Sequence, residues 1–173
     1  MPERKLILTG FMGSGKSTVG RILAERLGVR FIDLDAEIVA SAGYSINDIF
    51  AQKGEQGFRA LESLQLDKIL SSDDGAVLAT GGGAVISSQN RTQMRSRGVV
   101  VNLNVTLEQV IRRLKGCNDR PLLAGDDAAE RAQRLMSERE QFYSDADIRI
   151  DTDGKSVEDV AAEILCRLKG FSE

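Results

Sequence analysis

The sequence predicts an α/β protein: a three-layer α/β/α fold with a five-stranded parallel sheet, formed by residues 1–173 as a single domain. Short apolar segments alternate along the chain with longer segments of helical periodicity. A glycine-rich loop joins the first apolar segment to the first helical one, and no repeat or linker divides the chain. Such alternation is typical of a parallel sheet covered by helices on both faces, with ligands beyond the carboxyl ends of its strands.

Taken in order, the apolar segments predict strands at 5–9, 30–32, 76–80, 99–103 and 148–150. The segments between them predict helices near 15–27, 34–42, 55–71, 106–115, 127–143 and 156–168. The least regular stretch, 116–127, separates two of these helices, and we expect a mobile lid there.

Composition excludes several classes of partner. The chain is 42% hydrophobic and 28% charged, as in ordinary globular proteins, and its net charge of −3 provides no broad basic surface for nucleic acid. The sequence contains no run of about 20 apolar residues, so it predicts no membrane span. Cys117 and Cys166 lack metal-ligand spacing, which favours reduced thiols in a cytoplasmic protein and leaves a disulfide as the alternative.

The loop after the first strand matches the P-loop pattern G-x-x-x-x-G-K-[ST]. It reads Gly10-Phe11-Met12-Gly13-Ser14-Gly15-Lys16-Ser17, and Thr18 follows within the expected helix. Glycines let backbone N–H groups face phosphates, and the helix N-terminus adds its dipole. In this pattern the lysine reaches the β- and γ-phosphates and the serine hydroxyl binds Mg²⁺. The alternative is a glycine-rich turn that binds nothing.

Two carboxylates lie at the carboxyl end of the second strand. This strand ends in Phe31-Ile32-Asp33-Leu34-Asp35, and its two-residue period places Asp33 and Asp35 on the same side, facing the phosphate loop. One could hold Mg²⁺, directly or through water, and the other could serve an acceptor. The alternative reading is that they are helix caps or solvated loop acids.

The third strand ends in Thr80-Gly81-Gly82-Gly83, where many P-loop ATPases carry an acidic residue. Because this strand end carries no acidic residue, Asp33 is favoured as the carboxylate near the metal. Three glycines also suggest a backbone surface that a small molecule can approach closely, although a tight turn would use the same residues.

The chain contains no histidine, so a general base must be a carboxylate or a less usual group, and Asp35 is the leading candidate. Four arginines are expected near the ligand side of the sheet: Arg59, Arg113, Arg120 and Arg139. Arginine suits planar recognition of carboxylate and phosphate. Each could instead be a solvated surface cation.

Together these motifs resemble shikimate kinase. The P-loop, Asp33-Leu34-Asp35, Gly57-Phe58-Arg59 with Glu62, Thr80-Gly81-Gly82-Gly83, Arg120-Pro121-Leu122-Leu123 and Arg139 occur in the order and approximate spacing of that family. The match extends almost from end to end.

The resemblance implies a P-loop kinase fold and phosphorylation of the 3-hydroxyl of shikimate by ATP, with Mg²⁺ as cofactor. Lys16 and Ser17 would hold the phosphates and Mg²⁺, with Asp33 reaching the metal through water. Asp35 would bind acceptor hydroxyls and take the proton. The other assignments place Arg59 and Arg139 on the acceptor's carboxylate, Gly81, Gly82 and Gly83 against its ring, Phe50, Phe58 and Leu122 on its apolar face, Arg120 on the transferring phosphoryl group and Arg113 over the adenine. The acceptor-binding helical segment would span about 34–62.

Two other functions remain open from the sequence. One is a different small-molecule kinase, such as a gluconate or nucleoside-monophosphate kinase, because a fold does not determine a substrate. The other is an ATP-binding switch without catalysis, which the presence of Asp35 and Arg120 disfavours. We expect a monomer.

Overall fold

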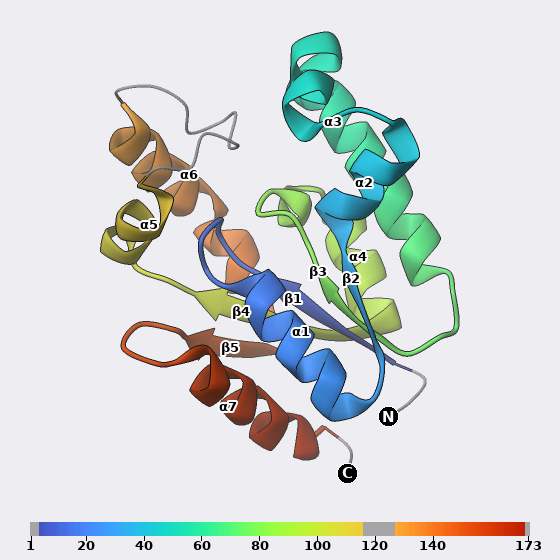
Figure 1. The fold of residues 1–173 in the computed structure, drawn as a ribbon, viewed down its shortest axis with the longest axis vertical. Coiled ribbons are helices and arrows are strands. Elements are labelled where there is room, and N and C mark those ends of the chain that lie inside the picture. Colours follow the sequence, from blue (N-terminus) through green and yellow to red (C-terminus); the bar gives the residue numbers. More distant parts are fainter. Residues whose placement is uncertain (1–3, 116–126, 172–173) are drawn as a thin grey trace.

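The computed structural model describes residues 4–115 and 127–171. Its centre is a five-stranded, all-parallel sheet with the strand order β2-β3-β1-β4-β5 (Figure 1). The strands are β1 (Lys5–Thr9), β2 (Arg30–Asp33), β3 (Ala76–Ala79), β4 (Gly98–Asn104) and β5 (Ile148–Asp151). The predicted fold class is therefore confirmed.

Helices connect these strands. In the described residues they are α1 (Lys16–Leu27), α2 (Leu34–Ala42), α3 (Ile46–Leu70), the 3-10 turn η1 (Ala84–Ile86), α4 (Ser88–Arg97), α5 (Leu107–Leu114), α6 (Ala128–Tyr143) and α7 (Val157–Lys169). None of these helices has the length and apolar character needed to cross a membrane.

The sheet separates two hydrophobic cores. Successive side chains of a strand point to opposite faces, so Leu6 and Leu8 of β1 enter one core while Ile7 enters the other. Helices α1 and α7 cover the first core (Figure 1). Helices α3, α4 and α6 contribute to the second. Because both faces are covered, the central strands β1 and β3 are buried along their whole length, as is typical of parallel sheets.

The strand order places the phosphate loop at the middle of the sheet. The chain runs from β1 to one side through β2 and β3, and later to the other side through β4 and β5. In open α/β sheets the crevice at such a reversal is the usual ligand site. The loop after β1 opens into this crevice, close to the carboxyl ends of β2 and β3.

The structure corrects two helix predictions. Helix α3 begins at Ile46, not near residue 55, and changes direction at Gly54, where φ is 68° and ψ is −177°. This conformation is nearly restricted to glycine. Helix α4 was not predicted at all, because its sequence SQNRTQMRSR is polar and buries only Asn90 and Met94. The other expected helices and strands agree with the structure to within one residue at each end.

Candidate active site

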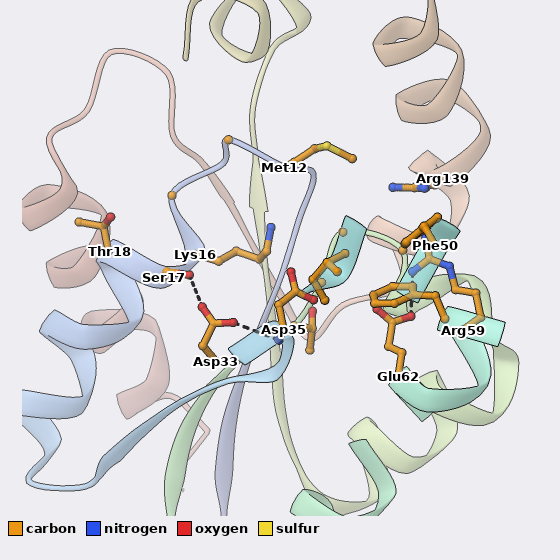
Figure 2. Close-up of a pocket in the computed structure, with 18 residues that line it drawn as sticks. Met12, Lys16, Ser17, Thr18, Asp33, Asp35, Phe50, Arg59, Glu62 and Arg139 are labelled. Carbon is orange, nitrogen blue, oxygen red and sulfur yellow. Dashed lines mark hydrogen bonds and ion pairs between the residues drawn. The ribbon is translucent and has the colours of Figure 1, made fainter. Parts of the chain in front are cut away.

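A cavity of about 420 Å³ lies at the carboxyl ends of the strands (Figure 2). The P-loop forms one end and two arginines, Arg59 and Arg139, lie at the other, with Asp35 between them. Among the described residues, its lining is Met12, Gly13, Gly15, Lys16, Ser17, Thr18, Asp33, Asp35, Ile46, Phe50, Phe58, Arg59, Glu62, Thr80, Gly81, Gly82, Gly83 and Arg139.

The P-loop end is organised around Lys16. Its Nζ atom donates hydrogen bonds to the carbonyl oxygens of Gly10 and Phe11, at 2.7 and 3.0 Å, and lies 3.4 Å from the Ser14 hydroxyl. Gly10 has a φ of 147°, and a Cβ atom there would lie 2.6 Å from the carbonyl oxygen of Leu103. The first glycine of the motif is therefore required both by conformation and by close packing on β4.

Ser17 and Asp33 form a second polar contact at this end. The Ser17 hydroxyl donates a 2.8 Å hydrogen bond to Oδ2 of Asp33. The Oδ1 atom of Asp33 caps helix α2 by accepting from the backbone N–H groups of Asp35 and Ala36. Asp33 is thus a helix cap and also the partner of the motif serine. These are oxygen donors of the kind that Mg²⁺ prefers, with few protein ligands and room for water.

Asp35 reaches the cavity in a different way from that predicted. The strand ends at Asp33, so Asp35 belongs to the first turn of α2 and the two-residue period of a strand does not relate the two acids. Both nevertheless line the same cavity. Asp35 points at the triple-glycine turn, where a Cβ atom on Gly81 would lie 3.1 Å from its Oδ1 atom.

Arg59 is held by Glu62 on the next turn of α3. Its Nη1 atom donates a 2.8 Å hydrogen bond to Oε1 of Glu62, whose side chain is only 1% exposed. Burial raises the pKa of Glu62, while the positive charge and hydrogen bond of Arg59 act in the opposite direction. On its outer side, Arg59 lies 3.6 Å from Glu55, and its guanidinium lies 5.2 Å from the Phe58 ring centre.

Arg139 enters the cavity from α6 and is almost completely buried, with 2% exposed. Among the described residues, none of its three guanidinium nitrogens has a hydrogen-bond partner. Its guanidinium carbon lies 5.8 Å from the ring centre of Phe11. A buried cation without hydrogen bonds is costly, so this group is well placed to bind an anion.

The triple-glycine turn runs between these groups without side chains of its own. A Cβ atom on Gly83 would lie 2.2 Å from Nη2 of Arg59, and one on Gly81 would lie 2.8 Å from Oε2 of Glu62. The Gly82 carbonyl oxygen accepts a 2.5 Å hydrogen bond from the hydroxyl of Tyr143. Glycine at 81 and 83 therefore leaves space for the arginine and the two acids to face the cavity.

Phe50 and Phe58 form an apolar wall near the arginines. Their ring centres are 4.8 Å apart at an angle of 34°, and Ile46 and Met12 also line the cavity. Such a wall excludes water from one side of a bound molecule. The cavity therefore combines an apolar surface with charged groups at its two ends.

A second cavity, of about 360 Å³, adjoins the outer side of the P-loop. Gly13, Gly15 and Thr18 line both cavities, so the two meet at the loop. Arg113 lies here and donates a 2.6 Å hydrogen bond to the carbonyl oxygen of Gly13. The other described residues that line it are Ser14, Val19, Thr152, Lys155, Val157 and Val160.

The sequence did not predict all of these residues. Ile46, Tyr143 and the segment 152–157 were given no place in the site, and Met12, Glu62 and Thr80 were named only within motifs, without a role of their own. The burial of Glu62 depends on the fold, and the position of Thr152 directly after the last strand was a further available signal. Arg120 and Leu122, with nearly all of the expected lid, lie outside the described residues.

Comparison with known proteins adds independent information. Residues 12–169 match the family model described as shikimate kinase. A shikimate kinase of Geobacter metallireducens is 59% identical over 167 residues, which are 96% of this chain and 93% of that protein. The structure of shikimate kinase from Acinetobacter baumannii in complex with shikimate superposes with a TM-score of 0.93 at 38% identity, covering 96% of this chain and 93% of that one. A gluconokinase from Sinorhizobium meliloti, at 16% identity and a TM-score of 0.64 over 98% of this chain and 93% of that one, shares the fold.

Proposed function

The chain belongs to the shikimate kinase family, and from this premise we propose how its residues perform the reaction. It is an ATP-dependent phosphotransferase that converts shikimate and ATP into shikimate 3-phosphate and ADP, a step of aromatic amino-acid biosynthesis. The observation that carries the proposal is the buried guanidinium of Arg139, which shares a cavity with the P-loop. The cavity thus pairs a phosphate cradle with a receptor for an acceptor's carboxylate.

Arg139 and Arg59 bind the carboxylate of shikimate. Arg139 offers hydrogen-bond donors that no described group uses, and Arg59 is held in place by Glu62. A carboxylate between them would receive charge-assisted hydrogen bonds, which are about twice as strong as neutral ones. Phe50 and Phe58 pack on the apolar face of the ring, and Leu122 stays a proposal from the sequence alone. Gly81, Gly82 and Gly83 let the ring approach the backbone.

Asp35 binds the acceptor's hydroxyls and accepts the proton of the attacking one. Its place in the cavity, between the P-loop and the two arginines, supports this role (Figure 2). A base must reach the reacting hydroxyl at the moment when the phosphoryl group transfers. Because the chain has no histidine, a carboxylate is the natural group for this task.

The P-loop binds the phosphates of ATP. Backbone N–H groups of Gly13, Ser14 and Gly15, the helix dipole of α1 and the ammonium group of Lys16 all favour negative charge here. Ser17 and Asp33 would hold Mg²⁺, the hydroxyl directly and the carboxylate through water, and their 2.8 Å contact supports this donor set. Magnesium bound there supplies positive charge to the β- and γ-phosphates. Thr18 lies next to them on α1.

The second cavity accommodates the nucleoside. It continues from the P-loop and is bordered by Arg113, for which we propose a stacking contact over the adenine. Arg120 is proposed, from the sequence, to stabilise the charge of the transferring phosphoryl group. Phosphoryl transfer requires mainly positioning and positive charge, which this set of residues supplies.

We further propose that the protein acts as a monomer in the cytoplasm. The large hydrophobic side chains that are exposed in the described residues are dispersed over several elements: Leu27, Tyr44, Leu64, Ile86, Val157 and Phe171. Single exposed apolar residues are normal in monomers, whereas stable interfaces need continuous patches.

ADP formation from MgATP, measured with shikimate, gluconate, a nucleoside monophosphate or no acceptor, tests the function. Strong stimulation by shikimate alone is the expected result. Stimulation by gluconate or a nucleotide would instead identify another small-molecule kinase. ATP binding without stimulation by any acceptor would indicate a nucleotide-dependent switch.

A further inference from the structure

We propose that Tyr143 is a positioning residue of the acceptor site: its hydroxyl bonds the Gly82 carbonyl and thereby fixes Arg139 against the triple-glycine turn. The inference rests on the proposed function, in which Arg139 binds the acceptor's carboxylate. It predicts that the tyrosine hydroxyl affects the binding of the acceptor and not that of the nucleotide.

The three carbonyl groups of the turn are satisfied in different ways. Those of Gly81 and Gly83 accept backbone hydrogen bonds from Ala84 and Ile86, at 3.2 and 3.1 Å, as the chain enters η1. The middle carbonyl, that of Gly82, accepts from Tyr143 at 2.5 Å. The turn is thus closed by its own backbone at two points and tied to α6 at the third.

Tyr143 and Arg139 approach this turn from the same side. They are four residues apart in α6, so their side chains share one face of the helix. Tyr143 is 5% exposed, and a Cβ atom on Gly82 would be 3.5 Å from Nη1 of Arg139. The same glycine therefore receives the tyrosine's hydrogen bond and lies beside the arginine's guanidinium.

Arg139 depends on this attachment more than Arg59 does. Arg59 has Glu62 as a hydrogen-bond partner. Among the described residues Arg139 has no such hydrogen-bonded carboxylate, so its position depends on its neighbours, Tyr143 among them, and on where α6 lies. A helix that moved away from the turn would carry the guanidinium with it.

Tyr143 is suited to be a permanent donor. Burial raises the pKa of Tyr143 to about 12, although the positive charge of Arg139 acts to lower it. The hydroxyl therefore stays protonated near neutral pH and continues to donate to the Gly82 carbonyl.

The test is steady-state kinetics of Tyr143→Phe with shikimate and MgATP. We expect the KM for shikimate to rise about tenfold, the size of effect that loss of about 1.4 kcal/mol produces, with little change in the KM for ATP. Ser137→Ala, which removes an exposed hydroxyl from the same helix, is the matched control and should leave both constants unchanged.

A double substitution separates positioning from general destabilisation. In an Arg139→Lys background the guanidinium is already absent, so adding Tyr143→Phe should raise the KM for shikimate by much less than tenfold. A merely structural effect would be the same in both backgrounds. Replacing Tyr143 with 4-aminophenylalanine, which keeps an N–H donor at the ring's end, should restore the KM to near the wild-type value.

The outcomes are distinct. The inference would be overturned if Tyr143→Phe left the KM for shikimate unchanged, or if it raised the KM for shikimate and the KM for ATP equally. The proposed function would still stand in that case, provided that the wild-type protein phosphorylates shikimate. A wild-type protein that does not phosphorylate shikimate would overturn the function itself. If Tyr143→Phe does not fold, the 4-aminophenylalanine protein still decides, because a tenfold higher KM in that variant contradicts the proposed hydrogen bond.

Discussion

Arg59 donates a 2.8 Å hydrogen bond to Glu62, a carboxylate that is 1% exposed and lies at the inner end of the acceptor cavity. The pair spans one turn of α3, so a single helix provides both the cation and the group that orients it. The arginine keeps its outer side toward Glu55 at the surface. The two acidic partners of Arg59, Glu62 and Glu55, can therefore be substituted separately.

Glu62→Ala should lower the free energy of unfolding by roughly 2 kcal/mol and raise the KM for shikimate. Breaking a buried ion pair usually costs about 3–5 kcal/mol, and Arg59 is partly exposed, which reduces the loss. Glu55→Ala is the matched control, because this surface partner should contribute under about 1 kcal/mol. Urea unfolding of the two variants measures both values, and equal losses would contradict the structural argument.

Glu62 also predicts a pH dependence of stability. Its pKa is raised by burial, so the unfolded chain ionises near the ordinary value of 4.5 while the native protein still holds the proton. Above that pH the native state binds more protons than the unfolded state, and stability from this group falls as pH rises. Urea unfolding of the wild type and Glu62→Gln from pH 4.5 upward should show the wild type losing stability relative to the variant. If the wild type instead gained stability relative to Glu62→Gln as the pH rises, the pKa of Glu62 would be lowered in the native protein and not raised.

Arg139→Met should produce opposite changes in stability and activity. Without ligand, replacing this buried side chain with an apolar one should raise the free energy of unfolding by about 1–3 kcal/mol, the usual cost of burying a polar group without hydrogen bonds. The KM for shikimate should rise about 100-fold, since charged hydrogen bonds contribute about 1.5–3 kcal/mol each. Arg149→Met, which removes an arginine paired with Glu140 at 2.6 Å, should not stabilise the protein. Thermal unfolding and kinetics test both.

Gly83→Ala should impair acceptor binding more than folding. The new Cβ atom would occupy the place of the Arg59 guanidinium, which is the end of a flexible side chain and can move away. We expect a shikimate KM at least about tenfold higher, equivalent to about 1.4 kcal/mol, with a stability loss below about 1 kcal/mol. Gly28→Ala is the control and should affect folding more than acceptor binding. The φ of 66° at Gly28 strains an alanine by about 1 kcal/mol, and because Gly28 does not line the cavity, the KM for shikimate should not change.

Ser17→Ala should raise the Mg²⁺ concentration needed for half-maximal activity. The hydroxyl is the proposed direct ligand, and its loss also leaves Oδ2 of Asp33 without its 2.8 Å partner. Activity titrated with Mg²⁺ at fixed ATP measures the effect. Ser156→Ala, which removes the cap of α7, should reduce stability by about 1 kcal/mol and leave the Mg²⁺ requirement unchanged. Equal Mg²⁺ curves for wild type and Ser17→Ala would remove Ser17 from the metal site.

Most of the fold could be predicted because apolar periodicity marks each buried strand and most helices. Helix α4 escaped because its polar sequence packs mainly through Met94, which leaves no periodic pattern. The first part of α3 was not predicted, and the structure shows helical geometry on both sides of the non-helical Gly54.

The candidate site could be predicted where its residues follow strands. The P-loop, Asp33 and the triple glycine all occupy that position, and topology alone brings them together. Tyr143 could not be predicted, since its role depends on a hydrogen bond to a residue 61 positions away. Asp35 lines the cavity, but not through the strand geometry expected from the sequence, because Asp33 caps α2 and the helix takes Asp35 into its first turn.

The change of direction at Gly54 determines how α3 can build a wall. In an uninterrupted α-helix, residues eight apart are separated by about 12 Å along the axis and point about 80° away from each other. Phe50 and Phe58 are eight apart, yet their ring centres are 4.8 Å from each other. The backbone conformation of Gly54 therefore bends α3 sharply. Phe50 and Phe58 lie on the two helical parts on either side of the bend, and their rings meet on its inner side. The width of the acceptor cavity is in this way governed by two torsion angles at a residue that contributes no atom to its lining.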